Sequence, residues 1–109
     1  MQPSMLSVIH VLIMGVSSDD YDRVLHDSAD DAQRVAATIA GVVGVDVYGA
    51  PDHSEVMLIS QWTDETAWSK AQWDELMQDV VVARFRDARR VHAKLYHRVD
   101  LKSSATGSA

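Results

Sequence analysis

The sequence predicts one α+β domain in which a four-stranded sheet carries two helices on one face. Two apolar runs at residues 7–14 and 55–62 have strand composition, and two long stretches show helical periodicity. The segments follow one another in the order β-α-β-β-α-β. With 109 residues, 47% of them hydrophobic, the chain has the size of a single domain. We assign residues 1–102 to this domain and expect the small, polar residues 103–109 to form a disordered tail.

The first half of the chain contains one strand and one helix. Residues 7–14 are rich in β-branched side chains and apolar at nearly every position, which is typical of a central strand buried on both faces. Residues 19–41 have apolar positions three and four apart and aspartates in the first turn, which indicate an amphipathic helix. Gly41 and Gly44 are expected to end this helix.

A hairpin follows the first helix. Residues 45–49 form a short strand, residues 50–54 have the composition of a turn, and residues 55–62 form a second apolar strand that ends in Trp62. Met57 in this strand points away from the face that carries Trp62, because side chains alternate along a strand. The hairpin therefore brings two strands of unequal faces together.

The second helical stretch and the last strand complete the domain. Thr63 and Asp64 are suited to cap a helix, and helical periodicity continues to about residue 90 with Phe85 on the apolar side. A kink is expected near residues 72–74. Residues 91–99 alternate as a strand does.

The order of these segments leads to a ferredoxin-like sandwich. Consecutive βαβ connections are right-handed, so two of them joined by a hairpin place both helices on one face of an antiparallel sheet. The other face carries Met57 and Ile59 and is left bare. We expect two such faces to meet in a homodimer.

Composition argues against several classes of function. The net charge of −6 opposes binding to nucleic acid or to an anionic membrane. The absence of cysteine removes disulfides, thiolate catalysis and sulfur-ligated metals, and it fits a cytoplasmic protein. The longest apolar stretch, residues 5–16, is too short to cross a bilayer. None of the histidine pairs has the spacing of a metal site, and no phosphate-binding loop or nucleophile elbow is present.

Several residues are candidates for ligand contact. His10 lies in the middle of a buried strand and is either a hydrogen-bonded core histidine or a residue that contacts a ligand. The aromatic residues Tyr48, Trp62 and Trp68 either fill the core or line a flat apolar pocket for an aromatic ligand. Arg84 begins a basic C-terminal segment that either forms a solvated face or binds an acidic ligand or a phenolate.

Residues 56–68 resemble the most recognisable stretch of the antibiotic-biosynthesis monooxygenase family, in which an apolar strand ends in tryptophan and an acidic cap, alanine and an aromatic residue follow. Residues 41–47 are similar to the segment that leads into the family's second strand. The resemblance covers about residues 5–99. It implies a dimeric α+β barrel with a pocket in each subunit between the sheet and the helices.

The resemblance also implies an activity. Members include cofactor-free oxygenases that convert polyketide anthrones to quinones, and heme-degrading enzymes. The axial histidine of the heme-degrading branch lies on the second helix, and residues 64–90 contain no histidine. We therefore expect a cofactor-independent monooxygenase that acts on an aromatic or polyketide small molecule with dioxygen, in secondary metabolism and without a bound cofactor or metal.

Individual residues follow from the same resemblance. Trp62 matches the pocket tryptophan, Trp68 replaces a tyrosine, and Tyr48 falls near a pocket histidine. Leu58 departs from the pattern, because the anthrone oxygenases carry an asparagine there to hold the oxyanion or peroxide. That role would fall to Tyr48, His10, Ser60 or an arginine. The candidate catalytic residues are Trp62, Tyr48 and His10, and the candidate substrate-binding residues are Leu58, Ser60, Trp68, Trp73 and Arg84.

Two other functions remain open from the sequence. The same barrel can catalyse cyclisation or isomerisation, with Tyr48 or His10 moving a proton. It can also serve as a non-enzymatic dimer that binds a small ligand, because the sequence shows no convergent set of charged residues.

Overall fold

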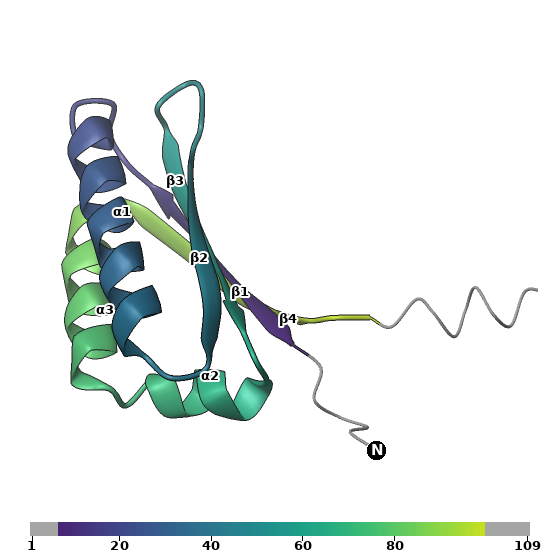
Figure 1. The fold of residues 1–109 in the computed structure, drawn as a ribbon. Coiled ribbons are helices and arrows are strands. Elements are labelled where there is room, and N and C mark those ends of the chain that lie inside the picture. Colours follow the sequence, from purple (N-terminus) through teal and green to yellow (C-terminus); the bar gives the residue numbers. More distant parts are fainter. Residues whose placement is uncertain (1–6, 100–109) are drawn as a thin grey trace, which may run out of the picture.

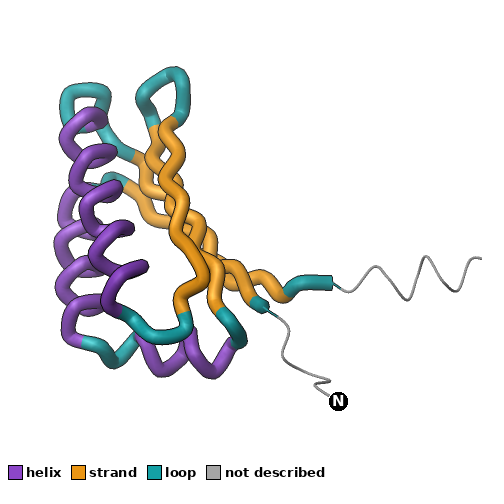
Figure 2. Tube along the Cα trace, in the orientation of Figure 1, coloured by secondary structure: helices purple, strands orange, loops and turns teal. Residues whose placement is uncertain are grey.

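The computed structural model describes residues 7–99. They form two layers, a four-stranded antiparallel sheet and a layer of helices against one of its faces (Figures 1 and 2). The ferredoxin-like α+β fold predicted from the sequence is confirmed. The predicted tail at residues 103–109 lies outside the described residues. The elements in chain order are β1 (Val8–Gly15), α1 (Tyr21–Thr38), β2 (Val42–Gly49), β3 (Glu55–Trp62), α2 (Glu65–Ala71), α3 (Glu75–Asp87) and β4 (Arg90–His97).

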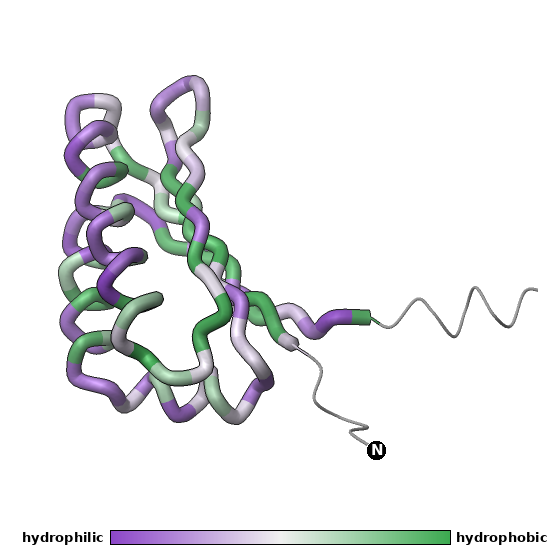
Figure 3. The backbone as a smooth tube through the Cα atoms, viewed as in Figure 1, coloured by the Kyte–Doolittle hydropathy of each residue, from purple (hydrophilic) through white to green (hydrophobic). Residues whose placement is uncertain are grey.

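Strand β1 is central, as its apolar composition predicts. The sheet order is β2-β3-β1-β4, and β1 pairs antiparallel with β3 and β4. Val8 and Met14 are buried under the helices, so the even-numbered side chains of β1 face that layer. Hydrophobic residues are concentrated along the strands, whereas α1 alternates between hydrophilic and hydrophobic segments (Figure 3). The helices therefore cover one apolar face of the sheet.

The helix predicted to run to about residue 90 is two helices, so the continuous helix is wrong and the predicted kink is a full break. Asp64 caps α2 as expected, accepting a hydrogen bond from the Ala67 backbone nitrogen at 2.8 Å. Asp74 caps α3, accepting from the Leu76 nitrogen at 2.9 Å. Asp74 has an extended backbone, as helix N-cap residues do. The chain therefore leaves the helical conformation of α2 before α3 begins.

The break also changes which residues of α3 are buried. Phe85 is 47% exposed, and the neighbouring Arg84 is only 8% exposed. The prediction that Phe85 belongs to the apolar side is therefore wrong. The helical periodicity counted along α2 does not predict which residues of α3 are buried, because α3 begins after the break and packs against α1.

The segment around Gly41 also differs from the prediction. Helix α1 ends at Thr38, and β2 begins already at Val42, with an irregular register between Val42 and Gly44. Gly41 has a φ of 90°, in the region that favours glycine. A Cβ at this position would lie 2.5 Å from the Cβ of Ala67 in α2. Gly41 therefore lets the connection pass close to α2.

Replacement of Gly41 with alanine is expected to lower the free energy of unfolding by about 1–3 kcal/mol, because both the backbone conformation and the contact with α2 are strained. Urea denaturation measures the effect. Gly44→Ala is the matched control, since a Cβ there meets nothing within 4 Å. Equal stabilities of the two variants would contradict the prediction.

The core consists of two clusters with a gap between them. One cluster contains Val8 and Trp62, which are cross-strand partners, and the other contains Met14 and Val56, which are also partners. Between these pairs on the same face of the sheet lie the rows His10–Ser60 and Leu12–Leu58. The middle of the sheet thus forms the floor of a cavity under the helices.

Candidate active site between the sheet and the helices

A partly open cavity of about 90 Å³ lies over the middle of the sheet. It brings together five of the eight residues predicted from the sequence, namely His10, Leu58, Ser60, Trp62 and Trp68. The sheet supplies the floor, and α1, α2 and α3 supply the walls. The full lining is His10, Leu12, Asp31, Ala32, Val35, Val45, Leu58, Ser60, Trp62, Trp68, Gln72, Met77, Val80 and Val81.

His10 projects from β1 into this cavity. Its ring lies beside the indole of Trp68, with the ring centroids 5.5 Å apart. Burial lowers the pKa of His10 below the ordinary value of 6.5, because desolvation disfavours the charged form. Within residues 7–99 no side-chain hydrogen bond reaches the His10 ring. The lowered pKa favours the neutral imidazole, in which one ring nitrogen can accept a proton.

Ser60 and Trp62 form a hydrogen-bonded pair on β3. The indole Nε1 of Trp62 donates to the Ser60 Oγ at 2.9 Å. Trp62 is 1% exposed and belongs to the core cluster at one end of the sheet, and it also lines the cavity. The two roles that the sequence left open for Trp62 are thus both present in its geometry.

Two polar residues of the lining were not among the candidates from the sequence. Gln72, in the break between α2 and α3, donates from Nε2 to the backbone oxygen of Trp68 at 2.9 Å. Asp31, on α1, is buried and forms part of the cavity wall. The kink predicted at residues 72–74 includes Gln72. The sequence could not show that Gln72 lines the cavity, because the direction of its side chain depends on how α3 packs.

Asp31 and Arg84 are the centre of an ionic cluster that joins α1 to α3. Nε of Arg84 lies 2.9 Å from Oδ2 of Asp31, and Nη1 of Arg84 donates to Oδ2 of Asp87 at 2.9 Å. Arg23 donates to the other oxygen of Asp87 at 3.1 Å. Arg84 is thus buried behind the cavity wall and paired with carboxylates, and it does not line the cavity.

Tyr48 and Trp73 also lie away from the cavity. Tyr48 is 49% exposed on the opposite face of the sheet, where its cross-strand partner is Met57. The alternation of side chains along β2 could have predicted this placement. Val45 faces the helices, and Tyr48, an odd number of residues away, must face the other side of the sheet. Trp73 lies in the α2–α3 break and is 81% exposed.

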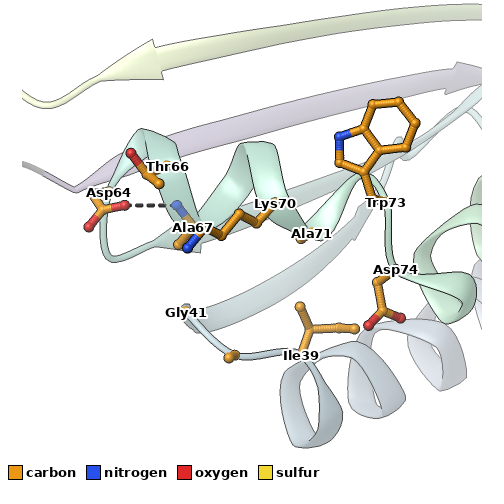
Figure 4. Close-up of a pocket in the computed structure, with 10 residues that line it drawn as sticks. Ile39, Gly41, Asp64, Thr66, Ala67, Lys70, Ala71, Trp73 and Asp74 are labelled. Carbon is orange, nitrogen blue, oxygen red and sulfur yellow. Dashed lines mark hydrogen bonds between the residues drawn. The ribbon is translucent and has the colours of Figure 1, made fainter.

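Trp73 lines a second, outer groove of about 550 Å³ between α2 and the α1–β2 connection (Figure 4). Figure 4 shows Ile39 and Gly41 on one side of this groove and α2 on the other. Its carboxylates, Asp64 and Asp74, are occupied as helix caps. The inner cavity is therefore the better candidate for a site of chemistry.

Two further features bear on the kind of site. Within residues 7–99, no three histidine, aspartate or glutamate side chains lie together as a metal site would require. No helix in the same part of the chain has both the length and the hydrophobicity needed to span a membrane.

The antiparallel ferredoxin-like fold is shared with solved structures of the antibiotic-biosynthesis monooxygenase type. A structure described as an antibiotic biosynthesis monooxygenase matches with a TM-score of 0.72 and 14% identity, covering 85% of this chain and 99% of the other. SnoaB, a cofactor-independent oxygenase from Streptomyces nogalater, matches with a TM-score of 0.70 and 18% identity over 86% and 94% of the two chains.

A third solved structure has a similar fold. A conserved protein from Methanosarcina mazei Go1 matches with a TM-score of 0.76 and 11% identity, covering 87% of this chain and 95% of the other. No protein-family profile matches the sequence, and no curated protein is similar to it at a significant level. At these identities the structural likeness shows the fold.

Proposed function

We propose that this protein is a cofactor-independent oxygenase that acts on an enolisable aromatic small molecule, with His10 as the general base. The observation that carries the proposal is an imidazole without a side-chain partner in a mostly apolar cavity, where burial favours its neutral form. A general base needs a free nitrogen and a pKa that leaves it unprotonated at the working pH. The likeness to SnoaB, a cofactor-independent oxygenase, supports the same class of reaction.

The reaction begins with proton transfer. His10 takes an acidic proton from the substrate, and the electron pair stays on the substrate as an enolate. The enolate passes one electron to dioxygen, and the radical pair combines to form a hydroperoxide. Loss of water then leaves a carbonyl, so that CH₂ and O₂ become C=O and H₂O. The substrate itself supplies the electrons, and apolar residues such as Leu12 and Val80 keep bulk water from the reacting atoms.

The size of the cavity restricts what binds next to His10. Its volume of about 90 Å³ is smaller than the engineered cavity of roughly 150 Å³ that accepts benzene in another protein. We propose that no more than a single ring enters this space, and that its entry requires small movements of the wall. A second pocket of about 290 Å³ shares Gln72, Met77 and Val81 with the cavity. We propose that the rest of a larger substrate extends past these three residues into that pocket.

Oxygen uptake tests the proposal. Purified protein is mixed with a phenolic anthrone or a single-ring analogue in the presence of a chelator and without flavin, and dissolved oxygen and product mass are followed together. We expect enzyme-dependent oxygen uptake and a product that has lost two hydrogens and gained one oxygen. Conversion that proceeds equally under argon, with no oxygen in the product, would contradict the oxygenase.

A cyclase or isomerase is the second candidate, and Leu58 is the observation that favours it. Leu58 lines the cavity. By the sequence resemblance, it stands where the anthrone oxygenases carry an asparagine, and its side chain cannot stabilise a peroxide by hydrogen bonding. Proton transfer by His10 requires no such group. Turnover under argon to a product of unchanged mass would support this function, and ligand binding without turnover would support a non-enzymatic binding protein.

We also propose that the protein functions as a homodimer through the open face of the sheet. This face carries Val11 and Ile59, which are cross-strand partners, and the adjacent Met57, and none of them is covered by the helices. Pairing two such faces removes apolar surface from water.

Replacement of Ile59 with lysine is expected to convert the dimer to a monomer, because it places a charge in the centre of the apolar face. Light scattering coupled to gel filtration measures the mass. Val82→Lys is the control, since Val82 is exposed on α3 and lies on the helical side. A monomeric wild-type protein at micromolar concentration would contradict the dimer.

A further inference from the structure

The floor of the cavity contains one polar pair in an apolar row. Across the four strands this row consists of Val45, Ser60, His10 and Leu95, each paired in register with the next. Ser60 and His10 both line the cavity. The Cβ atoms of directly opposed residues in an antiparallel pair lie about 4.5–5.5 Å apart. A ligand on this floor therefore meets two polar groups side by side and apolar side chains beyond them.

The hydrogen bond from Trp62 determines what Ser60 offers. A serine hydroxyl can both donate and accept, but the indole N–H only donates. Because Nε1 of Trp62 donates to Oγ at 2.9 Å, one acceptor position of Ser60 is occupied and its own hydrogen remains to be donated. Within residues 7–99 the Ser60 hydroxyl donates to no other side chain. An N–H bond to Oγ also polarises the O–H group and strengthens it as a donor.

The pair is therefore directional, with an acceptor at His10 and a donor at Ser60. We infer that Ser60 binds the carbonyl oxygen of the substrate, and that the His10–Ser60 pair selects single-ring ligands whose hydroxyl and carbonyl oxygens are separated by two or three carbon atoms. The inference rests on the function proposed above and gives Ser60 the stabilising role that Leu58 cannot perform.

The movement of charge in such a ligand matches the pair. When His10 takes the hydroxyl proton, the electron pair left on that oxygen delocalises through the ring onto the carbonyl oxygen, which is the atom held by Ser60. A hydrogen bond to an oxygen that gains charge strengthens as the reaction proceeds. The other ionisable residue of the lining, Asp31, is paired with both Arg84 and Arg34.

The test compares two ligands and three proteins. The ligands are 2-hydroxyacetophenone, which has both oxygens, and phenol, which lacks the carbonyl. The proteins are the wild type, Ser60→Ala, which removes the donor, and Ser60→Thr, which keeps a hydroxyl. NMR titration gives the Kd of each combination, and the measured quantity is the ratio of the Kd for phenol to that for 2-hydroxyacetophenone. Circular dichroism establishes that each variant is folded.

We expect Ser60→Ala to reduce this ratio by about five- to tenfold, the usual effect of losing one hydrogen bond, and Ser60→Thr to retain it. The ultraviolet spectrum of the bound 2-hydroxyacetophenone gives an independent readout. At pH 7 the ionised form is expected to be more populated in the wild type than in Ser60→Ala, which a purely structural role of Ser60 would not produce.

The outcomes separate this inference from the proposed function. The role of Ser60 would be overturned if Ser60→Ala weakened the binding of both ligands equally, or if Ser60→Thr lowered the ratio of the Kd values as well. Either result would leave a His10-based site intact. Failure of the wild type to bind either ligand would overturn the cavity as a ligand site, and with it both the role of Ser60 and the proposed oxygenase.

Discussion

Replacement of His10 with phenylalanine is expected to lower the rate of substrate-dependent oxygen uptake by about 10²- to 10⁴-fold, the usual contribution of a general base. Phenylalanine preserves a flat ring beside Trp68 and removes both nitrogens. The packing of the cavity is therefore retained and the chemistry is lost. Steady-state oxygen consumption, with circular dichroism as a check on folding, measures the change.

His26→Phe is the matched control, because His26 lies on the exposed side of α1. Its rate should equal that of the wild type. A rate for His10→Phe within threefold of the wild type would remove His10 as the base and return it to the role of a core residue.

The same substitution should change how stability depends on pH. Burial holds the pKa of His10 in the folded protein below its ordinary value of 6.5. Between these two values the unfolded chain binds more protons than the folded one, so stability falls as the pH is lowered through this range. Between pH 7.5 and pH 5.5, the free energy of unfolding of His10→Phe should therefore decrease less than that of the wild type. Urea denaturation at the two pH values measures this difference.

Replacement of Arg84 with methionine is expected to lower the free energy of unfolding by about 2–4 kcal/mol, because it leaves the buried Oδ2 of Asp31 without a partner, while Arg34 still donates to Oδ1. Methionine has a similar length, so little packing is lost. Asp87 loses its hydrogen bond to Arg84 as well, but it keeps the one from Arg23. Chemical denaturation monitored by tryptophan fluorescence measures the loss.

Two further variants test the explanation. Arg86→Met, an exposed substitution on the same helix, should stay within about 0.5 kcal/mol of the wild type. The double variant Arg84→Met, Asp31→Leu should regain much of the lost stability, because no buried carboxylate oxygen is then left without a partner. A double variant as unstable as Arg84→Met would show that packing at Arg84, and not the unpaired carboxylate oxygen, determines the effect.

Much of the fold could be predicted from local sequence patterns. The bounds of β3 were predicted without error, and β1 and α1 were predicted to within three residues at each end, because apolar alternation and helical periodicity are properties of neighbouring residues. The cap at Asp64 was predictable for the same reason. Alternation along β3 also predicted that Leu58, Ser60 and Trp62 share one face.

The sequence by itself determined the order of the elements and which side chains of each strand lie together. Only the tertiary structure decided that His10 pairs with Ser60, fifty positions away, because the register between strands depends on how the whole sheet assembles. It likewise placed Tyr48 on the far face and Arg84 in the interior, where Arg84 pairs with Asp31 on α1. Local patterns fix what each segment can bury, and contacts between distant segments fix which of those residues meet.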